Sequence, residues 1–229
     1  MNDSADEHDK TGAFIRRSWD LVEDPTDPAW RAKRSLAKAL RRLNNFTIGA
    51  RAGAAELTEA AQRVEQALAL IESQGSSSFK EDFDSGAYFE SPEIYADRAW
   101  LTGNCNPISP LAKLEQDGQF ARASVCFGNA YVGAPGWVHG GAVAAIFDQV
   151  MGFVLIMKGH PCVTAELAVK YHSPTPAHGD LKLRAHETKR VGSRVFIEAT
   201  CHHGSILTAT ASATFVLLKA SRFASYLSS

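Results

Sequence analysis

The sequence predicts an α+β fold in which a curved antiparallel sheet wraps around one long buried helix. Much of residues 98–220 consists of short segments of alternating apolar and polar side chains joined by turn residues, the pattern of neighbouring antiparallel strands. Residues 140–158 interrupt this pattern and are apolar nearly all round. A helix that is apolar on every side has to be buried on every side, so the sheet must curl around it.

The strands are expected to lie next to their sequence neighbours, because their connections are short. Asp117-Gly118, between the first two strands, is the dipeptide that type I′ hairpin turns favour. Further turn candidates contain Gly192 and Gly204. The expected strands, of which five or six form the sheet, are Leu111–Gln116, Gln119–Phe127, Cys162–His172, Leu181–Thr188, Val195–His202 and Ile206–Leu217.

The first ninety residues have a different character. Residues 1–29 are expected to form a flexible acidic N-terminus, and residues 30–90 a helical extension with a linker. Two apolar stripes at helical spacing predict two helices, the second ending near Gly75 and followed by a serine linker. The stripes are Leu36, Leu40 and Leu43 for the first helix, and Leu57, Ala60, Ala61, Val64, Ala67, Leu68 and Ile71 for the second. Such a hairpin is too small for a core of its own and should pack on residues 98–220 or on a partner subunit.

Composition excludes several classes of protein. The 229 residues suit one domain with an appendage, and a net charge of −1 gives no reason to expect nucleic acid as a partner. The start of the chain lacks the pattern of a secretory signal, and the longest apolar run, 142–157, is too short for a membrane span. Four scattered cysteines without a CxxC pair favour free thiols over disulfides or a metal site. We therefore expect a cytoplasmic protein without a metal.

A pair of glycines precedes the long helix, in the run Val138-His139-Gly140-Gly141. Glycines at a helix start allow close approach of another group, and the free amides with the helix dipole favour a carbonyl oxygen or an anion. The alternative is that the glycines only let the chain turn tightly into the helix.

Asp148 is the only charged residue between His139 and Lys158, and it lies eight residues beyond Gly140 on nearly the same side of the helix. A carboxylate held in apolar surroundings suits a general base or a nucleophile. The alternative is an interface aspartate satisfied by backbone amides or an arginine. Thr164, on the following strand, is by itself only a good strand residue. The serine-hydrolase elbow, zinc-protease and P-loop motifs are absent from the sequence.

The run from His139 to Asp148 resembles the H-G-G-x6-D signature of hotdog-fold acyl-CoA thioesterases. It is most similar to PaaI-like enzymes and to the thioesterase-superfamily branch of carboxyl-terminal-modulator-like proteins. The resemblance covers about residues 104–218. It implies a hotdog fold, an acyl-CoA substrate, no cofactor, and a homo-oligomer, a dimer or dimer of dimers, with active sites at the subunit interface.

The resemblance also implies roles for individual residues. Asp148 matches the catalytic carboxylate that activates water or attacks the thioester, and Gly140 matches the glycine whose amide polarises the carbonyl. Thr164 matches the hydroxyl residue that positions water, usually from the other subunit, and His139 either touches the thioester or holds the loop. Many PaaI-like members carry an asparagine where this chain has Gly133, so no catalytic asparagine is assigned. Substrate-binding residues are expected to be Val138, Gly141, Phe147 and Met151.

Two other functions remain open at this point. A non-catalytic acyl-CoA-binding or regulatory protein would keep the fold without needing Asp148 or Thr164, and both are present. An enoyl-CoA hydratase of the same fold would use an Asp and a His near the helix start, whereas Asp148 lies deep in the helix. The resemblance does not account for residues 1–90. We expect their helices to dock near the active-site entrance, where the acid-free, basic stretch from Trp30 to Ala55 meets the phosphates of CoA.

Overall fold

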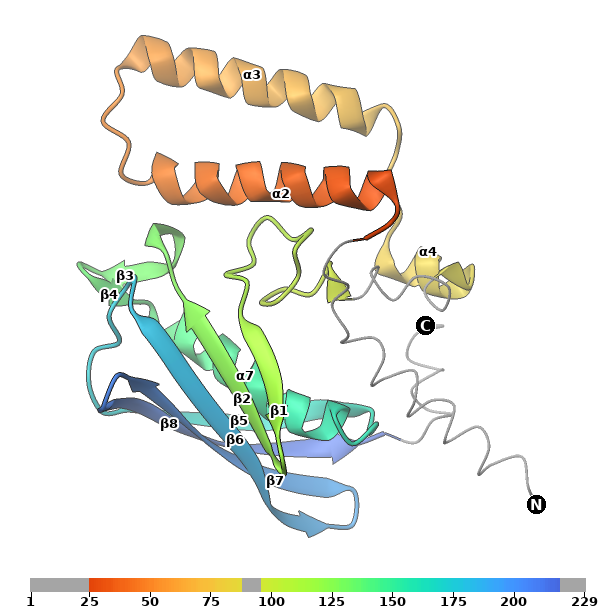
Figure 1. Ribbon diagram of the computed structural model, residues 1–229, viewed down its shortest axis with the longest axis vertical. Coiled ribbons are helices and arrows are strands. Elements are labelled where there is room, and N and C mark those ends of the chain that lie inside the picture. Colours follow the sequence, from red (N-terminus) through yellow and green to blue (C-terminus); the bar gives the residue numbers. More distant parts are fainter. Residues whose placement is uncertain (1–24, 88–95, 219–229) are drawn as a thin grey trace.

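Six antiparallel strands form one curved sheet, as the sequence predicts (Figure 1). The computed structural model describes residues 25–87 and 96–218, so the expectations for residues 1–24 lie outside the described residues. The strand order is β1-β2-β6-β7-β8-β5, which places β1 and β5 at the two edges. The strands are β1 (Lys113–Asp117), β2 (Phe120–Cys126), β5 (Cys162–Tyr171), β6 (Asp180–Val191), β7 (Arg194–His203) and β8 (Ile206–Leu217). A short pair, β3 (Val132–Ala134) and β4 (Trp137–Val138), precedes the long helix.

The first hairpin turn differs from its expected type. Asp117 pairs with Phe120, so the two central residues are Gly118 and Gln119, and the expected type I′ turn on Asp117-Gly118 is wrong. Gly118 has a φ of 59°, while Gln119 is not among the described residues with positive φ, which is the pattern of a type II′ turn. Gly192 and Gly204 take the same first loop position in the hairpins β6–β7 and β7–β8. A glycine at this point fixes the register of all three hairpins.

The long helix α7 (Gly140–Ile156) crosses the sheet and packs against β2, β5, β6, β7 and β8. One side of α7 is fully buried in the core, with Ile146, Phe147, Val150, Met151, Val154 and Leu155 at 0% exposure. The other side, which carries Asp148 and Gln149, is half-buried. The expectation of burial on every side is therefore met only on the side that the sheet covers, and the other side of α7 is half-buried in this chain. Gly159, with a φ of 71°, ends the helix, and the His160 amide donates to the Leu155 carbonyl.

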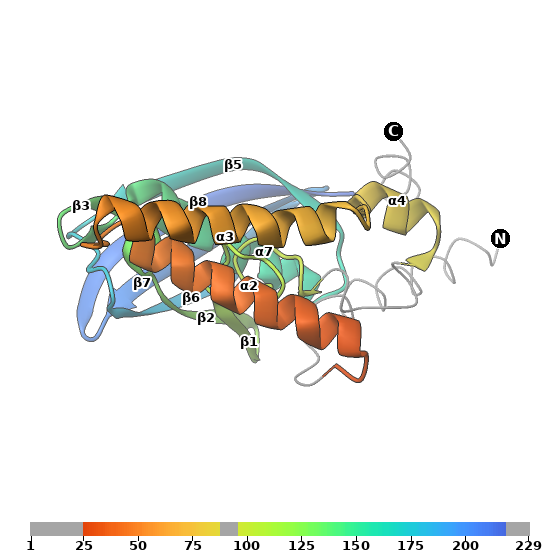
Figure 2. The ribbon, with the colours of Figure 1, turned by 90° about the horizontal axis from the view of Figure 1, so that it is seen from above.

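Two antiparallel helices, α2 (Pro28–Thr47) and α3 (Ala54–Glu72), form the expected hairpin, with α3 as the outermost layer (Figures 1 and 2). α2 begins earlier than its apolar stripe indicates. Asp27 caps it, since its Oδ1 accepts from the Ala29 amide at 2.7 Å, and Pro28 takes the first helical position, where proline is tolerated. No helix in the described part of the chain is long and apolar enough to cross a membrane.

A third short helix, α4 (Phe79–Asp84), lies where only a linker was expected. Its start is a capping box: the Ser78 hydroxyl accepts from the Glu81 amide at 3.1 Å, and the Glu81 carboxylate accepts from the Ser78 amide at 2.6 Å. The S-x-x-E spacing was the available sequence signal.

α2 docks on residues 98–218, hereafter the body, and on Asp97, which directly precedes it. Arg34 donates to both carboxylate oxygens of Asp97, at 2.6 and 3.0 Å, and Asp97 is completely buried. Arg41 donates to the carbonyls of Asn104 and Asn106, both at 2.8 Å. A bidentate pair out of water holds both partners in one geometry, so the Arg34–Asp97 pair fixes the position of α2.

Asp97→Ala is expected to destabilise this docking, because it removes the bidentate carboxylate partner of Arg34, whose side chain is only 15% exposed. Removing one member of a buried pair costs about 3 kcal/mol of unfolding free energy. Chemical denaturation should show the loss. Asp84→Ala is the matched control, since the Lys80–Asp84 pair is half exposed at both ends and its removal should change stability by less than about 0.5 kcal/mol. Equal effects of the two substitutions would contradict the anchoring role.

Candidate active site

The start of α7 leaves one backbone amide available. His139 is the N-cap, and its Nδ1 accepts from the Gly141 amide at 2.9 Å. The His139 carbonyl accepts from the amides of Ala142 and Val143, at 2.9 and 3.3 Å. Among the described residues the Gly140 amide has no hydrogen-bond partner. It is therefore the group at the positive end of the helix that can receive a carbonyl oxygen.

His139 holds the loop in this structure. Accepting a hydrogen bond at Nδ1 places its proton on Nε2, and the backbone amide of His139 donates to the Tyr131 carbonyl at 2.8 Å. Gly133 allows this arrangement, because a Cβ there would lie 2.9 Å from the His139 Cα. Gly133, the position at which many PaaI-like sequences carry an asparagine, therefore lies in close contact with the backbone of His139.

Tyr171 lies against the helix start and was not anticipated from the sequence. Its hydroxyl donates to the Gly140 carbonyl at 2.7 Å, and burial raises the pKa of this phenol. Tyr171 also lines a cavity of about 410 Å³ together with Trp137, Val138, Gly140 and Val143. A Cβ on Gly140 would lie 3.2 Å from the Tyr171 hydroxyl, so any other residue there would require the tyrosine to shift by a few tenths of an ångström. Tyr171 is the last residue of β5, and its contact with Gly140 joins residues that are 31 positions apart in the chain. The sequence around either residue therefore does not predict it.

Asp148 and Thr164 form the second part of the site. The Thr164 hydroxyl donates to Asp148 Oδ1 at 2.8 Å, and this contact lies within one chain, whereas the resemblance implied a hydroxyl residue that usually comes from the other subunit. No ion pair involves Asp148 among the described residues, so none of the described arginines accounts for its presence on the helix. The Asp148 side chain is half-buried, and Thr164 is exposed. The carboxylate is therefore oriented by a hydroxyl and remains accessible.

Cys162 lies beside this carboxylate. Burial, with the negative charge of Asp148 as a smaller cause, raises the pKa of the Cys162 thiol to about 12. The thiol stays protonated at neutral pH and is not a nucleophile there. Of the groups around Asp148, the carboxylate itself is the one suited to accept a proton or to attack.

The two parts of the site lie far apart along the same helix. Gly140 and Asp148 are separated by eight residues, which corresponds to about 12 Å of helix rise. Reacting atoms have to come within about 3–3.5 Å of one another. One thioester therefore cannot contact the Gly140 amide and the Asp148 carboxylate of the same chain together.

The remaining predicted residues divide into two groups. Val138 is buried and lines the cavity at the helix start, and Gly141 is exposed beside it. Phe147 and Met151 are fully buried between α7 and the sheet. Their assignment to substrate binding stays a prediction. No group of three potential metal ligands occurs within the described ranges.

The fold and the motif agree with known proteins. A family model of the Thioesterase superfamily matches residues 135–210. Acyl-coenzyme A thioesterase THEM4 of Mus musculus is 32% identical over 87 residues, which is 38% of this chain and 37% of that protein. The THEM4 protein of Rattus norvegicus is 31% identical over the same shares. The chain thus matches little more than a third of the length of these relatives.

A crystal structure of the thioesterase superfamily protein RHA08564 has the same fold. It superposes with a TM-score of 0.71 at 22% identity, over 86% of this chain and 98% of that one. A match of this extent goes beyond residues 98–220, so the likeness includes part of the helical extension. The resemblance to hotdog-fold thioesterases inferred from the sequence is confirmed, and so is the hotdog fold with N-terminal helices.

Proposed function

We propose that the protein is an acyl-CoA thioesterase, which hydrolyses acyl-CoA to a free acid and CoA. The observation that carries the proposal is the Thr164–Asp148 hydrogen bond on a helix whose Gly140 amide is free. The relatives in mouse and rat, whose names state this activity, support it. The proposal assigns the carboxylate to the water and the amide to the carbonyl oxygen.

Thioester hydrolysis requires both groups at once. As the carbonyl carbon is attacked, negative charge develops on its oxygen, and the Gly140 amide donates a hydrogen bond to it. Asp148, acting as base, takes a proton from water while the water oxygen bonds to the carbonyl carbon. The C–S bond then breaks, and the CoA sulfur leaves with the proton. In the alternative route Asp148 attacks the carbonyl carbon itself, the C–S bond breaks and CoA leaves as a thiolate. Water then hydrolyses the resulting anhydride, which releases the acid, regenerates the Asp148 carboxylate and supplies the proton that the thiolate takes up.

Because the Gly140 amide and the Asp148 carboxylate of one chain are too far apart to act on one thioester, we propose an active site shared between the two chains of a homodimer. We assign the amide to one chain and the Asp148–Thr164 pair to its partner. β5 supports this assignment, because it is a ten-residue edge strand with unpaired backbone groups. Apolar side chains on it, such as Val163, are about half exposed. Pairing of two β5 edges around a two-fold axis would cover them and make the interface isologous.

The substrate residues follow the same division. We assign Val138 and Gly141 to the thioester end of the substrate, since they lie beside the free amide. Phe147 and Met151 are assigned to the acyl chain, which would reach them by entering between α7 and the sheet, where both side chains are fully buried. All four cysteines are free thiols, which supports action in a reducing compartment such as the cytoplasm.

The test is thiol release by the purified chain from a panel of CoA esters, from acetyl to palmitoyl and including phenylacetyl. Hydrolysis of at least one ester is expected. Binding of CoA esters without hydrolysis of any would favour a regulatory binding protein. Hydration of an enoyl-CoA without thiol release would favour a hydratase. Gel filtration of the same sample measures whether the chain is dimeric.

Thr164→Ala is expected to lower kcat about tenfold with little change in KM, because a hydrogen bond to a charged group is worth ~1.5–3 kcal/mol. Steady-state kinetics on the best ester would measure both constants. Thr164→Ser keeps the hydroxyl and should retain most of the turnover. A change confined to KM would mean that Thr164 only lines the pocket.

A further inference from the structure

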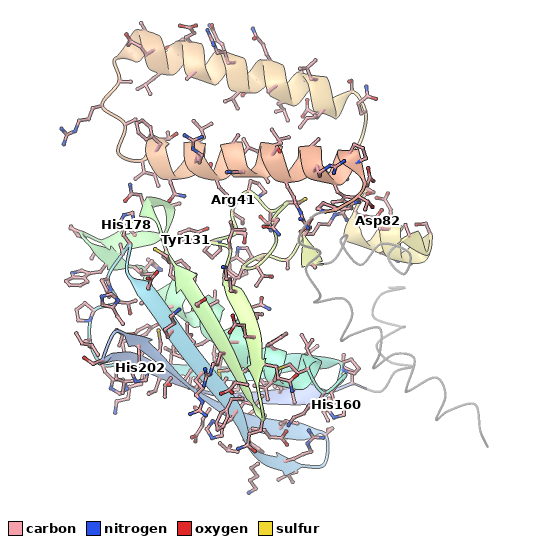
Figure 3. The ribbon with its side chains drawn as sticks, viewed as in Figure 1. Arg41, Asp82, Tyr131, His160, His178 and His202 are labelled. Carbon is pink, nitrogen blue, oxygen red and sulfur yellow. The ribbon has the colours of Figure 1, made fainter. Side chains whose placement is uncertain are left out.

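A cavity of about 920 Å³ lies between α2 and the body, beside the contacts that hold the two together, and it is not part of the site described above. One wall is a face of α2 between Arg34 and Phe46, together with Gly49 just after the helix. The opposite wall is formed by residues within 104–111 and 126–131. Figure 3 shows Arg41 on the side of α2 that faces Tyr131. The cavity is large enough for a nucleotide.

Positive charge dominates this cavity. Four basic side chains line it, and none of the described residues that line it is Asp or Glu. Arg34 pairs with Asp97, whereas Arg41 donates to two backbone carbonyls and forms no ion pair with a carboxylate in the described part of the chain. Partial burial of the Arg41 guanidinium lowers its pKa, because desolvation disfavours the charged form. An anion entering the cavity would compensate that charge.

Two more cations are exposed at its rim. Lys38 and Arg42 lie one helical turn apart on α2, and both side chains are exposed. Together with Arg41 they can surround phosphate oxygens from one side, and a guanidinium binds such oxygens in pairs. No acidic residue occurs between Trp30 and Ala55 to compete for them.

An exposed aromatic ring lies next to these cations. Phe46 lines the cavity and is 73% exposed, although phenylalanine is usually buried. An exposed aromatic face beside basic side chains is the combination that stacks on a nucleobase while its phosphates are neutralised. A free phosphate ion would need the cations and would gain nothing from Phe46.

The cavity adjoins the proposed active site through Tyr131. This residue lines the cavity, and its carbonyl accepts from the His139 amide, so the cavity wall continues into the turn before Gly140. A ligand with a phosphorylated nucleotide at one end and a thioester at the other would extend from the cavity over this turn to the Gly140 amide.

α2 is held tightly at this wall. Asn45 Oδ1 accepts from the Ala130 amide at 3.2 Å, and a Cβ on Gly128 would lie 2.2 Å from the same oxygen. Asn129 donates to the Asn45 carbonyl at 3.3 Å and contacts His178 at 2.8 Å. These contacts connect the helix to two loops of the body, so the basic side chains are presented by a fixed element.

We propose that this cavity binds the adenosine 3′-phosphate 5′-diphosphate end of a CoA ester, with Lys38, Arg41 and Arg42 on the phosphates and Phe46 on the adenine. The proposal rests on the proposed function for its substrate, and it makes α2 part of the substrate-binding surface of the thioesterase. A free adenine nucleotide or an inorganic phosphate shares part of this chemistry, and the binding experiment distinguishes them.

Binding is measured by calorimetric titration of the full chain with CoA, with adenosine 3′,5′-bisphosphate and with inorganic phosphate. The double variant Lys38→Glu/Arg42→Glu should bind CoA at least about tenfold more weakly, by a factor that shrinks at high salt. Phe46→Ala should weaken CoA and the bisphosphate several-fold without changing phosphate. The control Arg31→Glu/Arg51→Glu makes the same change in charge with two exposed residues outside the cavity.

Kinetics separate this proposal from the proposed function. In Lys38→Glu/Arg42→Glu, KM for an acyl-CoA should rise at least about tenfold more than KM for the same acyl group on pantetheine, which lacks the nucleotide. Equal effects on the two substrates, or equal binding by the cavity and control variants, would overturn the proposal. A chain that hydrolyses no thioester would disprove the function, while the CoA titration would still decide the cavity. Binding of all three probes with equal affinity would mean a phosphate site only, and would also overturn it.

Discussion

Asp148→Asn is expected to lower kcat for acyl-CoA hydrolysis by about 100-fold or more, because an amide cannot take a proton from water or attack the thioester. The side chain keeps its shape and can still accept the hydrogen bond of Thr164, which is 2.8 Å long in the wild-type chain. Thiol release under saturating substrate measures the effect. Binding of CoA, measured by calorimetry, should stay within about twofold, since the carboxylate contributes to the transition state and not to the nucleotide end.

Asp180→Asn is the matched control for this change. Asp180 is an exposed carboxylate at the start of β6, and its side chain is not part of the site. Its substitution should leave turnover unchanged. A variant Asp148→Asn that kept more than about a tenth of wild-type turnover would remove Asp148 from the chemistry. A variant that lost CoA binding and folded stability together would give Asp148 a structural role instead.

Local patterns sufficed for most of the fold. The strands and the helical hairpin carry periodic apolar side chains, and the long helix is a continuous apolar run, so local patterns identified each element. The pattern did not report burial in the hairpin, because the apolar stripe of α3, with Leu57, Val64, Leu68 and Ile71, is 39–50% exposed. Turn details were less accessible: the choice between Asp117-Gly118 and Gly118-Gln119 depends on the register of β1 and β2, which the dipeptide alone does not determine. α4 was missed because six residues are too few for a stripe, and its capping box was the remaining signal.

Some residues of the candidate site could likewise be predicted from the sequence, and others could not. His139, Gly140 and Asp148 lie within one helix, so their spacing could be read from the sequence. Tyr171 and Arg41 reach their partners across the fold, and their contacts depend on where separate elements end in space. Half-burial of Asp148 was also not predictable, because an apolar helix gives the same pattern whether a sheet or a second chain covers its last side.

Gly140→Pro is expected to lower kcat/KM about 100-fold or more, because it removes the one amide hydrogen assigned to the carbonyl oxygen. The backbone tolerates the change. Gly140 is the first residue of α7, where proline is favoured, and His139 has a ψ of 135°, which is compatible with a following proline. Gly140→Ala is the control: it introduces the same Cβ near Tyr171 but keeps the N–H. Similar losses in both variants would attribute the effect to the Tyr171 contact.

Mixing the two inactive variants should restore activity if the site is composite. In a dimer of one Asp148→Asn chain and one Gly140→Pro chain, one site combines the intact amide of the first with the intact carboxylate of the second. The other site lacks both groups. After subunit exchange at equal concentrations, half of the dimers are mixed and each has one working site, so about a quarter of wild-type activity should return. If the two groups acted within one chain despite the roughly 12 Å between them, every site in the mixture would lack one group and no activity would return.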